Sequence, residues 1–166
     1  TNVAMLNMLL YYIIKEGLDD KAFIEGRTEG YEDFKNHILS FDVNDLEKIT
    51  GVNKELARKA AIAYASAPNA MSFHGLGVTE HSQGTYTVML IADLAMITGN
   101  IGRRGVGVNP LRGQNNVQGS CDMGSFPHEF TGYRHVADKE VRSTFEADWG
   151  VTLDAEPGLR IPNMFA

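Results

Sequence analysis

The 166-residue sequence contains a single cysteine, Cys121. One cysteine cannot form an internal disulfide, and it cannot by itself hold an iron-sulfur cluster, which needs several cysteine ligands. A lone cysteine without a catalytic partner fixed by the sequence is more often a buried thiol than a nucleophile. The sequence therefore predicts neither a disulfide-stabilised fold nor a cluster held by this chain alone, and it is compatible with a reducing compartment.

Metal-ligand spacing is also missing from the sequence. Zinc sites commonly use two histidines one helical turn apart, or cysteines and histidines at similarly short intervals. The histidines here show no such spacing: they are His37, His74, His81, His128 and His135. We therefore expect no metal site built from this chain.

Positive charge and long apolar runs are scarce. Lys and Arg number 15 against 21 Asp and Glu, and the net charge of -6 argues against nucleic-acid binding, which requires a basic face. The longest apolar run, 5–14, is interrupted by Asn7 and is far shorter than the roughly 20 residues that cross a bilayer. No signal-peptide pattern precedes it. We expect no membrane span and a cytoplasmic location.

Apolar residues at helical spacing predict a helix-rich chain. The first helix presents Leu6, Leu10 and Ile13 to a core and ends at Gly17. Because this helical pattern is already under way at Thr1, we expect the chain to be a piece of a longer protein. Further helices are predicted over 20–26, 30–40, 44–50, 53–67, 85–97 and 138–149.

Two of these helices carry more detailed predictions. Asn44 and Glu47 resemble a capping box, which would begin the helix that Gly51 ends. Asn53 is the expected N-cap of the next helix. That helix is predicted to pack on a neighbour through one face, made of Leu56, Ala60, Ala63 and Tyr64.

One buried strand is predicted over 69–74, directly before Gly75-Leu-Gly77 and a helix. This order is half of a βαβ unit, in which ligands bind beyond the carboxyl end of the strand. A single strand cannot form a sheet, because its backbone groups need neighbouring strands. We expect the missing strands to lie outside this chain; the alternative is that a helix within it has been taken for a strand.

The stretch 98–124 is the most informative part of the sequence. It is too rich in Gly and Asn for a regular helix or strand, and too apolar at Ile101, Val106 and Val108 for a disordered linker. Glycine allows close approach of a ligand, and Asn and Gln offer hydrogen-bond donors and acceptors. The stretch is therefore predicted to be an ordered loop that could hold a large polar cofactor; a string of tight turns is the alternative.

Arg112 lies within this loop, between Pro110 and Gly113. Arginine presents a rigid fork of donors that matches a carboxylate or a phosphate. An anionic ligand is the functional interpretation. A surface arginine, or one held in a structural ion pair, is the alternative.

The run 95–124, with Asn109-Pro-Leu-Arg-Gly-Gln-Asn-Asn-Val-Gln-Gly119 at its centre, resembles the alpha subunit of molybdenum- or tungsten-dependent formate dehydrogenases, which are molybdopterin oxidoreductases. Gly75-Leu-Gly-Val-Thr-Glu-His81 and Gly84 resemble the preceding motif of that family. A weaker likeness over 24–34, and another around 149–150, extend the resemblance over nearly the whole chain.

The resemblance implies an α/β fold, a helix-rich fragment of a Rossmann-like αβα domain that binds molybdopterin dinucleotide through a parallel sheet. Residues 1–110 would be part of that domain, and 111–166 a crossover loop and the start of the neighbouring domain, both incomplete. It implies a parent that oxidises formate to carbon dioxide at bis-molybdopterin guanine dinucleotide with Mo or W, beside a 4Fe-4S cluster. The implied partners are formate, the remaining domains and electron-transfer subunits.

The resemblance also implies roles for individual residues. Arg112 corresponds to the active-site arginine that orients formate. The residues expected to bind cofactor are Gly75, Leu76 and Gly77 against one pterin dinucleotide, and Gly113, Gln114 and Asn116 near the metal. The family's cluster cysteines and metal-ligating cysteine or selenocysteine precede the region represented here, so this chain alone is expected to be inactive. Two alternatives remain: a stand-alone pterin- or nucleotide-binding module, and a sister enzyme such as a nitrate or polysulfide reductase.

Overall fold

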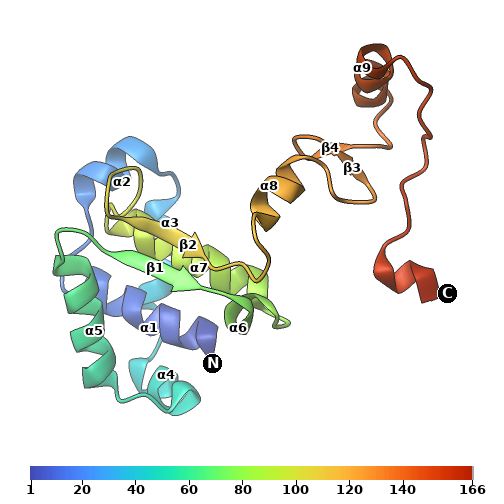
Figure 1. Cartoon of the computed structure of the whole chain (residues 1–166). Helices are drawn as coiled ribbons and strands as arrows, with labels where there is room; N and C mark the ends of the chain where they lie inside the picture. Colours follow the sequence, from blue (N-terminus) through green and yellow to red (C-terminus); the bar gives the residue numbers. More distant parts are fainter. Residues whose placement is uncertain (166) are drawn as a thin grey trace. The chain divides into compact units, whose positions relative to one another are not determined.

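The computed structural model of the chain describes residues 1–165, which divide into two compact units after Leu111 (Figure 1). Unit 1 is Thr1–Leu111, and unit 2 begins at Arg112. The chain is rich in helix and contains a short parallel sheet, so the predicted α/β class is confirmed. The assignment of 1–110 and 111–166 to particular domains stays a prediction.

Helices form the first part of unit 1, close to where the sequence predicts them. Asp20 caps α2 by accepting the backbone N–H of Phe23, and Asn53 caps α5 in the same manner. Gly17 and Gly51 adopt the left-handed conformation that ends α1 and α4. These helix predictions are confirmed, with the bounds α1 (Asn2–Lys15), α2 (Lys21–Arg27), α3 (Tyr31–Leu39), α4 (Val43–Thr50) and α5 (Lys54–Ser66).

The predicted capping box of α4 is wrong. Asp42 is the N-cap, and its side chain accepts the backbone N–H of Asn44 at 2.8 Å. Asn44 therefore lies inside the helix as a donor. Glu47 turns away and accepts the backbone N–H of Lys54 at 2.9 Å, which joins α4 to the start of α5. The carboxylate of Asp42, two residues before Asn44, reaches the unpaired N–H groups at the start of α4, so Asp42 is the N-cap.

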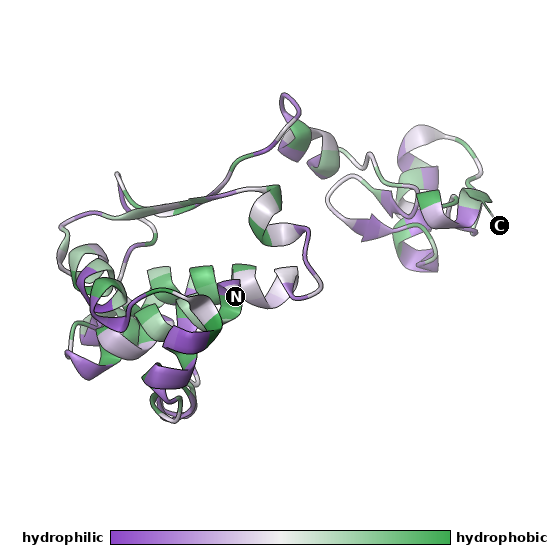
Figure 2. Ribbon diagram, turned by 90° about the horizontal axis from the view of Figure 1, so that it is seen from below, coloured by the Kyte–Doolittle hydropathy of each residue, from purple (hydrophilic) through white to green (hydrophobic). Residues whose placement is uncertain are grey.

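The core of unit 1 is built around α1. Met8, Leu10 and Ile13 are completely buried, and Figure 2 shows strong apolar colouring on the helices beside the N-terminus. α5 packs against α1 through Ala57 and Ala61, which are also completely buried. The predicted packing face of α5 is wrong at Leu56, which is 62% exposed, and at Ala60 and Ala63, which are exposed too, whereas Tyr64 packs against the core as predicted. The helix is turned by one residue, about 100°, so that small alanines face α1 and allow its close approach.

A buried carboxylate ties α2 to α3. The side chain of Asp19 is only 1% exposed, and it accepts hydrogen bonds from the Lys21 ammonium and the Tyr31 hydroxyl. Burial by itself raises the pKa of Asp19, but these two hydrogen bonds, a backbone hydrogen bond and the charge of Lys21 together outweigh it, and the pKa lies below its ordinary value of 3.8. Burial and the neighbouring Asp19 carboxylate raise the pKa of Tyr31. The ionised form of Asp19 is therefore the one that the fold stabilises.

This pKa shift predicts a pH-dependent loss of stability. Because the folded pKa of Asp19 is lowered, its stabilisation is complete above pH 3.8 and is lost as pH falls through the folded pKa. At pH 7 we expect Asp19→Asn to lower the unfolding free energy by about 2 kcal/mol. Urea unfolding from pH 6 to pH 2 should show the gap between wild type and variant closing in acid. A constant gap would contradict this account.

Two short strands complete unit 1 and run in parallel (Figure 1). β1 is Met71–His74 and β2 is Gly107–Pro110, with Met71 opposite Gly107 and His74 opposite Pro110. α6 (Leu76–Thr79) and α7 (Gly84–Ile97) lie between them in the chain. The positions of the strand over 69–74 and of the helix over 85–97 are confirmed within a residue or two. The prediction that the strand is buried is wrong, because Met71 and Phe73 are 44% and 62% exposed and only His74 at its end is buried.

The partner of β1 corrects two predictions. β2 lies within the stretch 98–124, which was expected to hold no strand, and it supplies a sheet neighbour that was expected outside the chain. α8 (Val117–Asp122) lies in the same stretch. The sequence of β2 has no alternation of apolar and polar residues. Its strand conformation depends on pairing with β1, helped by the Asn109 side chain, which donates to the Ser72 carbonyl at 3.3 Å.

Unit 2 is held by a small aromatic cluster. The ring of Phe130 lies 4.6 Å from that of Phe145 and 6.0 Å from that of Trp149. Tyr133, between the antiparallel strands β3 and β4, joins them to α8 by donating to the Asp122 carboxylate at 2.7 Å. The helix predicted over 138–149 is confirmed. The remaining elements are β3 (Glu129–Phe130), β4 (Arg134–His135), α9 (Lys139–Trp149) and the 3-10 helix η1 (Ile161–Phe165). None of the described helices is long and apolar enough to cross a membrane.

Candidate functional site

The carboxyl ends of β1 and β2 meet at one edge of unit 1. The backbone N–H of Leu111 donates to the His74 carbonyl at 2.6 Å, so the pairing continues to the last residue of unit 1. A Cβ placed on Gly75 would lie 3.5 Å from the Leu111 carbonyl oxygen. In open α/β sheets, ligands bind outside the carboxyl ends of the strands. This edge is therefore the candidate binding edge of unit 1.

The predicted cofactor-binding residues Gly75, Leu76 and Gly77 lie together at this edge, in what we call the glycine turn (75–77). Gly75 is the N-cap of α6, which begins at Leu76. The N–H groups of Val78 and Thr79 donate to the Gly75 carbonyl. Leu76 is 61% exposed, and Gly77 is also exposed. The backbone of the turn is thus fixed by its own hydrogen bonds and remains accessible.

Unit 2 opens with the second group of predicted residues, Arg112, Gly113, Gln114 and Asn116, which are all exposed. Arg112 makes no hydrogen bond or ion pair with any described residue. Asn116 adopts a left-handed backbone conformation with φ of 53° and is the N-cap of α8, but its side chain makes no capping hydrogen bond. The guanidinium of Arg112 and the side-chain amide of Asn116 therefore have no hydrogen-bond partner among residues 112–165.

The glycines in these two groups are not required by the folding of the described chain. Gly77 and Gly113 have no left-handed φ, and a Cβ on either would meet nothing within 4 Å. Gly75 has an extended backbone that any residue can adopt. By contrast, a Cβ on Gly84 or Gly124 would strike backbone atoms closer than 3 Å. The open space beside Gly77 and Gly113 fits the approach of a ligand to the backbone.

Other polar residues of the 98–124 stretch have structural roles. Asn100 is 1% exposed, and its side chain accepts the Ala70 backbone N–H at 3.1 Å and donates to the Thr98 hydroxyl at 2.9 Å. Arg103 donates to the Pro68 carbonyl at 2.9 Å. These bonds fix the start of β1 against the end of α7. The sequence could not distinguish these structural residues from the candidate cofactor-binding residues Gln114 and Asn116, because both sets are polar side chains in the same glycine-rich stretch.

Cys121 is a free, partly buried thiol on α8. Among residues 1–165, no group of three His, Cys, Asp or Glu side chains is placed to hold a metal ion. His74, at the end of β1, is 8% exposed, and its Nδ1 has no hydrogen-bond partner among the described residues. No sequence signal distinguished His74 from the other histidines. An unpaired ring nitrogen beside Gly75 is a polar group that a ligand or a further chain segment could satisfy.

A protein family and several known proteins resemble this chain over nearly its whole length. The family model described as molybdopterin oxidoreductase matches residues 1–163. Formate dehydrogenase H of Escherichia coli is 46% identical over 99% of this chain and 23% of its own length. The F420-dependent formate dehydrogenase subunit alpha of Methanocaldococcus jannaschii is 48% identical over 99% of this chain and 24% of its own length. The chain thus spans about a quarter of the length of these relatives.

Proposed function

Because the chain belongs to the molybdopterin oxidoreductase family, we propose that it is the central part of a formate dehydrogenase catalytic subunit that oxidises formate to carbon dioxide. The proposed cofactor is bis-molybdopterin guanine dinucleotide carrying molybdenum or tungsten. The 166-residue piece contributes cofactor binding and the active-site arginine, and is inactive alone. The observation that carries the proposal is the likeness to two formate dehydrogenases at 46% and 48% identity across 99% of the chain.

The residues that would hold the cofactor are the glycine turn at the sheet edge and the segment at the start of unit 2. Gly75, Leu76 and Gly77 would meet one pterin dinucleotide, and Gly113, Gln114 and Asn116 would line the cofactor near the metal. The open space at Gly77 and Gly113 supports this assignment, since the fold itself does not need glycine there. When bound, the metal-pterin centre supplies the two-electron redox chemistry of the reaction.

Arg112 would orient the substrate. Its guanidinium is exposed and makes no hydrogen bond or ion pair with the described residues, so its N–H groups are available to bind a ligand. Two parallel N–H donors match the two oxygens of formate. The same positive charge would compensate the negative charge that formate carries into the site. Arg112 thus binds and orients the substrate without exchanging a proton.

The proposed parent has parts that this chain does not contain. A 4Fe-4S cluster would be held by cysteines elsewhere, since Cys121 alone cannot ligate one. Formate, the remaining domains of the subunit and electron-transfer subunits are the proposed partners, and the cytoplasm the proposed location. A nitrate reductase and a stand-alone pterin-binding module remain the competing functions. The two relatives compared above are both named formate dehydrogenases, which favours formate.

Analysis of the full-length protein from its source tests the proposal. We expect molybdenum or tungsten by mass spectrometry, guanine-dinucleotide pterin after acid release, and dye reduction with formate but not with pyruvate. Nitrate should give no turnover in the reverse assay with reduced dye. A protein that contains the pterin but reduces nitrate would identify the sister enzyme. A protein of about this chain's size without metal would favour the binding module.

A further inference from the structure

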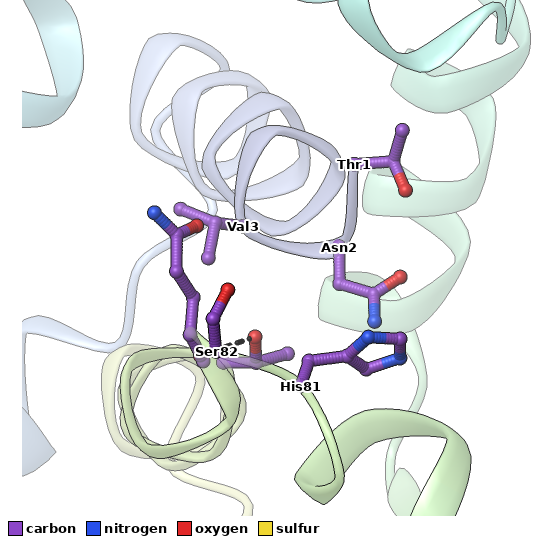
Figure 3. Close-up of a pocket in the computed structure, with 7 residues that line it drawn as sticks. Thr1, Asn2, Val3, His81 and Ser82 are labelled. Carbon is purple, nitrogen blue, oxygen red and sulfur yellow. Dashed lines mark hydrogen bonds between the residues drawn. The ribbon is translucent and has the colours of Figure 1, made fainter.

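His81 makes a contact that the sequence does not reveal. Its ring Nε2 lies 2.7 Å from the carbonyl oxygen of Gly77. The side-chain amide of Asn2, in the first turn of α1, approaches the same oxygen at 3.5 Å. Figure 3 shows the His81 ring beside the Asn2 side chain. Both residues line a polar pocket of about 150 Å³. Two side chains, one from α1 and one from the segment between α6 and α7, therefore converge on one carbonyl of the glycine turn.

The geometry of α6 explains why this carbonyl needs a side-chain donor. α6 has four residues, and its last turn is closed by the Glu80 N–H, which donates to the Leu76 carbonyl at 2.9 Å. If the helix continued, the backbone N–H of His81 would donate to Gly77. The backbone instead leaves the helix at Glu80, with φ of -87° and ψ of 52°. The Gly77 carbonyl is thus left without a described backbone donor, and the His81 ring takes that place as a C-cap.

From this arrangement we infer that His81 is a positioning residue for the cofactor-binding turn. The bond from the ring nitrogen spans four residues and closes the segment 77–81 into a loop, which limits how far Leu76 and Gly77 can move. A binding group must be held close to its productive position, because displacement by about 1 Å is costly. This inference rests on the proposed function, in which the glycine turn meets the pterin dinucleotide. His81 acts on the turn through the carbonyl of Gly77.

Substitutions at position 81 in the full-length enzyme distinguish the effect of the hydrogen-bond donor from the effect of the ring shape. His81→Phe keeps a planar ring without an N–H, and His81→Gln replaces the ring by an amide that can donate. Ser82→Ala is the matched control, since Ser82 lines the same pocket and makes no hydrogen bond with the described residues. The measurements are hydrogen-deuterium exchange of peptides covering 75–84, and the pterin and metal content of each purified protein.

We expect the backbone amides of the turn to exchange roughly fivefold faster in His81→Phe, the effect of losing one hydrogen bond. Its pterin content should fall, whereas His81→Gln should recover both values and Ser82→Ala should match wild type. Equal exchange and pterin content in His81→Phe and wild type would overturn the inference. So would equal losses in the Phe and Gln variants, which would make the ring rather than the donor responsible. A wild-type protein that lacks pterin would overturn the proposed function itself.

Discussion

Replacing Arg112 by alanine in the full-length enzyme should lower kcat/KM for formate by about 10²–10³-fold, the loss typical of removing one positioned donor group at an active site. The side chain is exposed and makes no ion pair with the described residues, so its removal leaves no buried charge unpaired within unit 2. Folding and cofactor content should therefore stay close to wild type. Arg112→Lys should recover only part of the loss, since an ammonium cannot contact both formate oxygens in parallel.

Arg104→Ala provides the matched control for this experiment. Arg104 is an exposed arginine in the same glycine-rich stretch, and it makes no hydrogen bond or ion pair with any described residue. Both variants change the net charge equally, so a general electrostatic effect on formate would appear in both. We expect steady-state kinetics of Arg104→Ala to match wild type. Wild-type turnover in Arg112→Ala with full pterin content would remove Arg112 from the active site.

The helices of unit 1 could be predicted from sequence because their signals are local. Asn53 caps α5, Gly51 ends α4, and apolar spacing identifies α1, and each signal lies within a turn of the element that it defines. The prediction of Asn44 as the N-cap of α4 was wrong because Asp42, two residues earlier, can accept the same backbone N–H groups. The wrong prediction of the packing face of α5 has another cause. Which alanines face inward depends on the shape of α1, and spacing within α5 does not contain that information.

The sheet and the site depended on long-range information. β2 has the sequence Gly-Val-Asn-Pro, and it becomes a strand because β1, 36 residues earlier in the chain, offers a row of backbone partners. The cofactor-binding glycines could be named only through resemblance to a family. The structure adds a physical criterion, since Gly77 and Gly113 have room for a side chain and Gly84 has none. The cap at His81 could not be predicted, because it depends on where α6 ends.

Gly84→Ala is the substitution that we expect to disturb the fold of the site most. Gly84 is the first residue of α7 and is buried. A Cβ there would lie 2.8 Å from the carbonyl carbon of Thr79 and closer still to its oxygen. Thr79 is the last residue of α6, so the backbone itself must move to admit a methyl group. Overpacking of this kind costs about 3 kcal/mol of unfolding free energy, which a urea titration would resolve.

Gly26→Ala separates this steric effect from the general effect of adding a methyl group to a helical glycine. Gly26 lies in α2 without a left-handed φ, and a Cβ there meets nothing within 4 Å. Alanine at this position should raise stability by up to about 1 kcal/mol. The two variants should therefore shift the urea midpoint in opposite directions. Equal midpoints would show that the turn between α6 and α7 adapts without strain.

Gly84→Ala should also lower the pterin content of the enzyme. The strained contact lies at the end of α6, and the glycine turn forms the beginning of the same short helix. Movement of Thr79 must therefore be transmitted to Gly77, because only one residue separates them. We expect the variant to bind less cofactor even under conditions where it remains folded. A folded Gly84→Ala enzyme with full pterin content would mean that the glycine turn is not what holds the dinucleotide.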